Sequence, residues 1–192
     1  MTLRLPETEL ATIARTHTAR FTPDFLLAHS ERSYLFGRAL LGEVDIDEEA
    51  GYLAALFHDA GLTDRYPGAE PFEIRSAAAA TEFLREYDVH GERAQAIVDG
   101  ITLHLDPATA AKEPQIALVH LGSAADVVGL RLDELPPGLV EDVVAAYPRH
   151  DMKRRLIELF EREIANNPTS QLAALERRFG LRALIASAPF AE

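Results

Sequence analysis

Apolar residues recur three and four positions apart along most of the chain, a spacing that places them on one face of an α-helix. Ala, Leu, Arg and Glu, which favour helix, dominate these segments. Clusters of Pro, Gly and Asp separate the segments and supply helix start and stop signals. No segment alternates apolar and polar residues as a half-buried strand does, and no unit repeats along the chain. The pattern predicts an all-α protein.

The breaks in this pattern set the expected helix boundaries. Thr22-Pro23-Asp24, for example, places proline in the first turn of a helix and an acid near its N-terminal dipole. The predicted helices cover about residues 6–17, 22–42, 45–58, 70–87, 92–103, 112–130, a short stretch after 138, 151–165 and 170–180.

A chain of 192 residues, 47% of them hydrophobic, is long enough for one domain with its own core. We expect a single domain over residues 1–192, with a metal-binding core at about 22–131. The helices at about 136–188 would form a C-terminal extension rather than a second fold. The apolar stripes of this extension would pack on the core or on a second subunit, so a homo-oligomer is possible. The stripes comprise Leu156, Leu159, Phe160, Leu172, Leu175 and Phe179.

Charge and composition exclude several classes of function. The 31 acidic and 19 basic residues give a formal net charge of −12, which would repel nucleic-acid phosphates. The absence of cysteine excludes disulfides, thiolate chemistry and Cys-ligated zinc. No apolar run reaches the roughly 18–20 residues of a membrane span, and the N-terminus lacks the apolar core of a signal peptide. We expect a soluble cytoplasmic protein without nucleic-acid or membrane partners.

The stretch "LAALFHDAGL" carries the first candidate chemistry. It places His58 and Asp59 at the buried end of an apolar helix, where ionisable groups are costly unless they are paired. Gly61 loosens the helix end, so that both side chains can reach one point. An imidazole and a carboxylate together suit a divalent cation such as Zn, Fe, Mn or Ni, although a buried ion pair would explain them equally well.

Two further residues of this kind stand on other predicted helices. His29 lies on an otherwise apolar helical face, and Asp126 is embedded in the apolar segment "GSAADVVG". Gly122 and Gly129 share a face with Asp126 and leave space around it. A buried aspartate needs either a cation or several hydrogen-bond donors. The remaining histidines, His17, His90, His120 and His150, are expected to lie outside any site.

His29, His58-Asp59 and Asp126 resemble the H…HD…D signature of the HD-domain superfamily of metal-dependent hydrolases. The resemblance implies an HD-domain helical bundle in which these four side chains ligate one divalent metal. It covers about residues 25–170 and is closest to the cyanamide-hydratase-like branch. The segments that carry it, in the order seen there, are "AHSERSY", "FHDAGLTDRY", "PFEIRSAAAATEFL", "AIVDGITLHLD", "YPRHDMKRRL" and "NNPTS".

The sequence also differs from the HD-domain pattern at several motif positions. HD nucleotidases carry Glu three residues after the motif aspartate, where this chain has Leu62, so Asp64 or Glu73 would have to stand in. Dinuclear members carry additional histidines, of which the first position is Glu73 here and a later one is His104. The resemblance therefore favours one metal over two, with Glu73 and His104 beside the metal ligands or facing the substrate.

The resemblance also suggests roles. A divalent ion lowers the pKa of bound water from about 15.7 to about 7, and Asp59 would ligate the ion and orient the water. Glu73, in the first turn of its helix, is the candidate general acid or base, or else a charge that only favours the helix. Arg32 lies one turn after His29 and would bind a substrate phosphate or pair with Asp59 or Glu73.

Three functions are consistent with these residues. The first is metal-dependent hydrolysis of a small-molecule substrate, with a phosphate ester as the leading candidate. The second is hydration of a small C≡N compound, which predicts a small, mostly apolar pocket without a cluster of phosphate-binding cations. The third is a non-catalytic helical module that binds or senses a metal.

Overall fold

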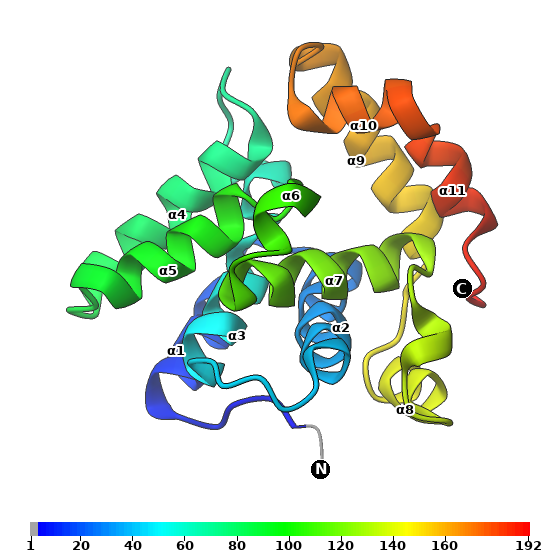
Figure 1. The fold of residues 1–192 in the computed structure, drawn as a ribbon. Helices are drawn as coiled ribbons and strands as arrows, with labels where there is room; N and C mark the ends of the chain where they lie inside the picture. Colours follow the sequence, from blue (N-terminus) through cyan, green and yellow to red (C-terminus); the bar gives the residue numbers. More distant parts are fainter. Residues whose placement is uncertain (1–3) are drawn as a thin grey trace.

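The helices begin and end at the capping residues that the sequence supplies. Asp47 accepts a hydrogen bond from Ala50 N at 2.9 Å, and Pro114 occupies the first turn of its helix. The computed structural model describes residues 4–192, and these contain helices and no strand, which confirms the all-α prediction (Figure 1). The elements are α1 (Glu9–Thr18), α2 (Asp24–Leu41), α3 (Glu48–Phe57), η1 (Ala60–Leu62), α4 (Phe72–Glu86), α5 (Gly91–Thr102), α6 (Pro107–Ala110), α7 (Pro114–Val128), η2 (Leu132–Glu134), α8 (Leu139–Ala146), α9 (Met152–Asn166), α10 (Gln171–Phe179) and α11 (Leu181–Ser187).

Each predicted helix is present within a few residues of its expected bounds, but four elements were not predicted. These are the short turns η1, η2 and α6, and the helix α11. Gly180 reads as a helix stop in the sequence, and it does end α10 in a left-handed conformation with φ +66°. The chain then turns directly into α11, which a stop signal does not reveal.

Helices α2 and α7 form the most extensive helix contact and cross at the centre of the fold (Figure 1). Glycine allows their backbones to touch. A Cβ atom at Gly122 would stand 1.7 Å from Ser33 O, and one at Gly37 would stand 2.1 Å from Leu118 O. This close approach brings His29 on α2 within reach of Asp126 on α7.

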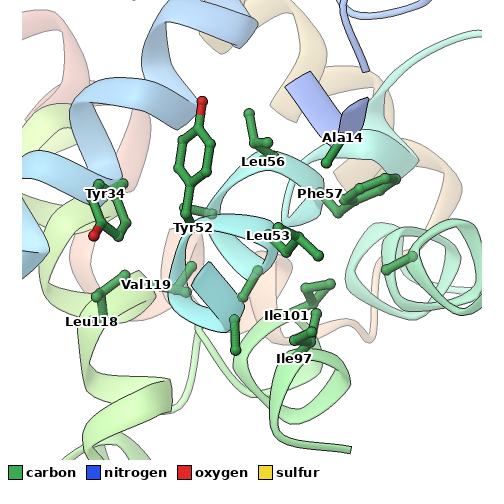
Figure 2. Packing of buried hydrophobic residues seen from close by; sticks show 14 of the residues in the cluster. Ala14, Tyr34, Tyr52, Leu53, Leu56, Phe57, Ile97, Ile101, Leu118 and Val119 are labelled. Atoms are coloured by element: carbon green, nitrogen blue, oxygen red, sulfur yellow. The ribbon is translucent and has the colours of Figure 1, made fainter. Parts of the chain in front are cut away.

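Helix α3 runs through the main apolar core, and nearly all of its side chains are buried. Figure 2 shows Leu53, Leu56 and Phe57 of α3 surrounded by residues of neighbouring helices, among them Ile97 and Ile101 of α5. Packing on several sides fixes the position of α3 and therefore of His58, which follows its last residue.

The C-terminal helices pack on the rest of the chain through a second apolar cluster. The predicted stripes contribute Leu156, Phe160 and Leu172 to it, and these side chains are at most 6% exposed. Their partners in the cluster include Phe25 and Leu26 of α2, Phe72 of α4 and Val127 of α7. Of the two packing alternatives left open by the sequence, the structure thus shows packing on the core, although Phe179 stays 53% exposed.

A membrane-spanning helix needs roughly 20 predominantly apolar residues. Within residues 4–192, no helix combines the length and apolar character needed to cross a bilayer. The longest, α2, carries charged residues at several positions, including Glu31, Arg32 and Arg38.

Candidate metal centre

Three side chains from three elements converge on one point. His29 stands in the middle of α2, His58 caps the end of α3, and Asp59 precedes η1. Their exposed fractions are 1%, 1% and 4%. His29 Nε2 lies 3.2 Å from His58 Nε2, and Asp59 Oδ2 lies 3.5 Å and 3.4 Å from these two atoms. The three donor atoms therefore form a nearly equilateral triangle that could hold a metal ion.

The end of α3 explains how two adjacent residues reach the same point. After His58 the helix stops, and Asp59 adopts φ −108° and ψ 8°, which turns its side chain back towards the imidazole. The sequence suggested that Gly61 would permit this turn. The structure adds the reason, because a Cβ atom there would stand 2.1 Å from Phe72 O. Gly61 lets η1 approach α4, and its N–H donates to Ser76 Oγ at 2.8 Å.

Hydrogen bonds at the far side of each imidazole fix the tautomers. His58 Nδ1 lies 2.7 Å from Ala55 O, and His29 Nδ1 lies 2.7 Å from Asp126 Oδ2. Both partners only accept, so both Nδ1 atoms carry the proton and both Nε2 atoms carry a lone pair. Burial, with a contribution from His29, lowers the pKa of His58 to about 3, which keeps this ring neutral. The two Nε2 atoms and Asp59 Oδ2 then face one another, and a cation at this point would satisfy all three donors.

The size of the triangle also fits a metal. First-row ions bind imidazole nitrogen and carboxylate oxygen at about 2.0–2.2 Å, and tetrahedral angles at these lengths separate the donors by about 3.4 Å. The measured separations are 3.2–3.5 Å. Two histidines and one carboxylate are a ligand set that occurs in catalytic zinc and non-haem iron sites. Burial raises the pKa of Asp59 when no cation is present, so a metal would also stabilise its charged form.

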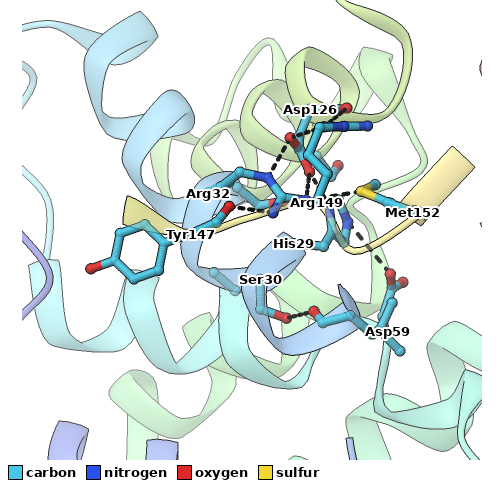
Figure 3. A network of polar contacts seen from close by, with 12 residues as sticks. His29, Ser30, Arg32, Asp59, Asp126, Tyr147, Arg149 and Met152 are labelled. Carbon is cyan, nitrogen blue, oxygen red and sulfur yellow. Dashed lines mark hydrogen bonds and ion pairs between the residues drawn. The ribbon is translucent and has the colours of Figure 1, made fainter. Parts of the chain in front are cut away.

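Asp126, expected to be the fourth ligand, occupies a different place. Its Oδ1 accepts from Arg32 Nε and Arg149 Nη1, both at 2.8 Å, and its Oδ2 accepts from Arg32 Nη2 at 2.9 Å and from His29 (Figure 3). These four donors fill the four lone-pair positions of the carboxylate. Burial alone would raise its pKa, but the Arg32 charge and the hydrogen bonds from His29 and Arg32 lower the pKa below the usual range. Asp126 therefore orients His29 from behind and lies outside the donor triangle.

Arg32 has neither of the roles expected for it. Its side chain is fully buried and binds Asp126, and its Nη1 donates to Tyr147 O at 2.8 Å and to Pro148 O at 3.1 Å. It does not pair with Asp59 or Glu73, and it has no exposed surface with which to bind a phosphate. Its function in the fold is to join α2, α7 and the segment before α9.

Sequence reasoning missed Arg149, the second cation on Asp126. Its side chain is 1% exposed and links Asp126 to the C-terminal tail, where its Nε donates to Glu192 at 3.0 Å and its guanidinium stacks on Phe190 at 4.1 Å. The segment "YPRHD" looks like an exposed charged loop. Only the fold shows that this arginine points inward.

Glu73, the expected general acid or base, lies outside both the donor triangle and the cavity beside it. It occupies the first turn of α4 as predicted, and it is 7% exposed. Burial raises the pKa of its carboxyl, with smaller contributions from Glu163 and Asp59, and its Oε2 has no hydrogen-bond partner. The position of Glu73 in the first turn of α4 was predicted correctly, but its side chain does not line the cavity.

His104 does reach the site, as expected. Its ring stands edge-on to that of His58, with centroids 5.1 Å apart, and its Nδ1 lies 2.6 Å from Ile101 O. The carbonyl fixes the proton on Nδ1 and leaves the lone pair on Nε2. Burial and the neighbouring His58 lower the pKa of His104 to about 3, so it is a neutral acceptor. His120, which the sequence placed outside the site, lies beside it, with its Nδ1 2.7 Å from His104 O.

A cavity of about 330 Å³ opens onto the donor triangle. Helices α7, α9, α10 and α11 supply most of its wall, and none of the described residues that line it is Arg or Lys. Apart from the donors, His104, His120 and Ser123, the lining is apolar; it comprises Phe72, Leu105, Pro107, Ala124, Val127, Val128, Leu130, Phe160, Leu172, Leu175, Phe179, Leu181 and Leu184.

The other histidines lie away from the centre. His90 and His150 are exposed, as the sequence predicted. His17, also expected in solvent, packs instead against the rings of Phe21, Phe57 and Phe83, at centroid distances of 5.8, 6.1 and 5.1 Å.

No protein-family model matches the chain, and no curated protein matches it significantly. Its function is therefore argued from the geometry of the centre.

Proposed function

We propose that the protein is a metal-dependent enzyme that adds water to a small uncharged organic molecule, by hydrolysis or by hydration. The observation that carries this proposal is the buried triangle of His29, His58 and Asp59, which borders a cavity without cations. One divalent transition metal, Zn, Fe, Mn or Ni, suits two imidazoles and a carboxylate. Such an ion supplies Lewis acidity and makes water nucleophilic near neutral pH.

The chain's own residues divide the remaining tasks. Asp126 holds the proton on His29 Nδ1 and so keeps Nε2 directed at the centre, as Ala55 O does for His58. His104 presents an unprotonated Nε2 at the cavity, and we assign it to orient the attacking water by accepting a hydrogen bond from it. The apolar wall excludes other water and so strengthens the electrostatic interactions inside.

The lining of the cavity bears on the choice of substrate. Proteins bind phosphate through Arg, Lys or clustered backbone N–H groups, because the dianion must be neutralised. Arg32, the cation nearest His29 in sequence, is hydrogen-bonded to Asp126 and so is not free to bind a phosphate. The chemistry therefore favours a neutral substrate over a phosphate ester. This agrees with the apolar pocket expected for a relative of the cyanamide-hydratase-like branch of the HD superfamily.

The number of ligands bears on the non-catalytic alternative. Structural zinc sites are closed by four protein ligands, whereas catalytic sites keep a position for water. Three donors converge here, and the candidate fourth, Asp126, is engaged by other partners. An open coordination position beside a cavity supports catalysis rather than a structural or sensing role.

Metal content and a substrate panel test the proposal together. We expect about one transition-metal ion per chain, and metal-dependent turnover of 4-nitrophenyl acetate or cyanamide that exceeds turnover of 4-nitrophenyl phosphate. His58→Ala should lose both metal and activity. Metal-dependent cleavage of the phosphate as the dominant activity would refute the neutral-substrate proposal, and a protein that binds no ion after reconstitution would refute the metal centre.

The role of His104 is tested on the same substrates. His104→Gln should keep its metal but lower kcat by about 10- to 100-fold, because the acceptor that orients the attacking water is displaced. Glu73→Gln is the matched control, a buried acid one helix away that should retain kcat within about threefold. Equal losses in the two variants would contradict the assignment of His104.

A further inference from the structure

The cavity beside the centre has a polar end and an apolar end. Its ionisable groups gather at the donor triangle with His104 and His120. The one other polar residue of the described lining, Ser123, is internally bonded, since its Oγ donates to His120 O at 3.2 Å, and His120 Nδ1 in turn contacts His104 O. A ligand that fills this space finds a reactive end at the metal site and only Leu, Val, Phe, Ala and Pro side chains beyond it.

The volume limits the ligand's size. Water occupies about 30 Å³ per molecule in the liquid, so a cavity of about 330 Å³ holds about eleven non-hydrogen atoms. A substrate such as cyanamide would fill only a fraction of it. The remaining volume belongs to an apolar body attached to the reactive group.

Exposed apolar side chains gather where the cavity opens. Five large hydrophobic residues are exposed in residues 4–192, and three of them, Leu130, Phe179 and Leu184, line this cavity at 45%, 53% and 42% exposure. Exposed apolar patches in a protein of this size mark interaction sites rather than packing defects. Here the exposed side chains line the same cavity as the donor triangle, so a ligand of that centre that extends outward would contact them.

We infer that the substrate is an uncharged amphiphile, of which the cavity encloses about eleven non-hydrogen atoms. Its hydrolysable or hydratable group reaches His29, His58 and Asp59, and its hydrocarbon body lies between α7 and the helices α10 and α11. Phe179 is the residue at the rim that selects for the length of this body. The inference rests on the proposed function for the reactive end of the molecule and on the cavity alone for the apolar end.

A series of linear alkyl hydroxamates separates the two ends in one experiment. The hydroxamate group chelates transition metals, while the chain grows from two to ten carbons. Calorimetric titration of the metal-loaded protein should show affinity rising about fourfold for each added methylene. The rise should level off near eight carbons, where head and chain together have about eleven non-hydrogen atoms. A chain of equal length that ends in a carboxylate should lose the gain, because its charge would be buried.

Substitutions in the cavity wall show where the alkyl chain of the hydroxamate binds. Ala124→Leu narrows the cavity wall and should abolish the gain for long chains without affecting acetohydroxamate. Phe179→Ala should weaken octanohydroxamate about three- to tenfold and leave acetohydroxamate unchanged. Val44→Ala, which shortens another exposed hydrophobic residue outside the cavity, is the matched control and should change neither affinity. Metal content is measured for each variant.

The outcomes distinguish this inference from the proposed function. Binding of all hydroxamates with equal affinity would overturn the amphiphile while leaving the open metal position intact. If no hydroxamate binds the metal-loaded protein, the open position is refuted, and linear alcohols titrated into metal-free protein then decide the apolar end. Affinity that rises with alcohol length supports the apolar site, and its absence overturns it.

Discussion

Asp126 accepts hydrogen bonds from His29, Arg32 and Arg149 and is fully buried. We expect Asp126→Asn to weaken metal binding about 10- to 100-fold, because the amide group cannot accept all four donors and His29 loses its orientation. Stability should fall by about 3–5 kcal/mol, since two buried arginines lose their counter-charge. Competition with a chelator and urea denaturation measure the two effects.

The same variant distinguishes a supporting residue from a ligand. If Asp126 were a ligand, the cobalt-loaded variant would show an altered coordination spectrum, whereas a supporting residue leaves the spectrum unchanged at saturating metal. Asp88→Asn is the control, because its side chain is almost fully exposed and its left-handed backbone tolerates asparagine. Retention of wild-type metal affinity in Asp126→Asn would refute the supporting role.

At the residue scale, the sequence predicted which side chains belong to the site better than it predicted their hydrogen-bond partners. A buried aspartate required a cation or several donors, and both alternatives were visible in "GSAADVVG". The structure shows that donors satisfy Asp126, and one of them, Arg149, lies 23 positions away, where no local signal pairs it with Asp126. His58 and Asp59 were found because they adjoin each other at a helix end, so local sequence was sufficient.

At the scale of elements, the crossing of α2 and α7 sets the geometry of the centre. Gly122 was expected to leave space for Asp126, but it faces the backbone of α2. We expect Gly122→Ala to destabilise the protein by about 3 kcal/mol or more, because the methyl group would overlap Ser33 O at 1.7 Å and force the helices apart. Metal affinity should fall with it as His29 moves away from Asp126.

Gly100→Ala is the matched control for this prediction. Gly100 is also inside a helix, but its Cβ would meet Ala54 Cβ at 3.2 Å, and the gain in helix propensity offsets part of that contact. Denaturation curves should place Gly100→Ala within about 1 kcal/mol of the parent protein. Equal effects of the two substitutions would show that helix approach does not control stability here.

Helix positions were predictable because their signals are local. Asp47, Pro114 and Ser170 each start a helix with their own side chain or ring, whatever surrounds them. The direction of a side chain is not local. Glu73 and His17 were assigned by their neighbours in sequence, and each faces a surface that other helices create.

At the scale of the whole molecule, the C-terminal helices complete the cavity that the core helices begin. The three candidate metal donors lie within residues 29–59, but the wall of the cavity beside them comes largely from residues 120–184. The tail then returns to the core, because Arg149 bridges Asp126 to Glu192. Apolar periodicity predicted that these helices would bury a face, but no local pattern indicated that a second face would line a site.

Stability of the whole metal-free protein should fall in acid. His58 and His104 have their pKa lowered to about 3 by burial, whereas unfolded histidine titrates near pH 6.5. Between about pH 4 and 6 the unfolded chain therefore binds two protons that the folded chain does not. Burial raises the pKa of Asp59, Glu73 and Glu31, and protons kept by these carboxyls in the folded state offset part of the difference, while the lowered pKa of His17 adds to it. The contribution of His58 and His104 is a stabilisation that is present above about pH 6.5 and lost as the pH falls towards 3.

Urea denaturation with a chelator at pH 4.5, 5.5 and 6.5 measures this slope. His104→Gln removes one of the two histidine protons and should flatten it, whereas His90→Gln, at an exposed position, should not. Saturating metal should add about 4 kcal/mol at a free concentration of about 1,000 times Kd, because only the folded chain assembles the three donors. That addition should shrink in acid, because protons compete with the metal for the donor side chains of the folded chain. A stability that is independent of pH over this range, or an equal slope in His104→Gln, would show that these imidazoles are not held neutral by burial.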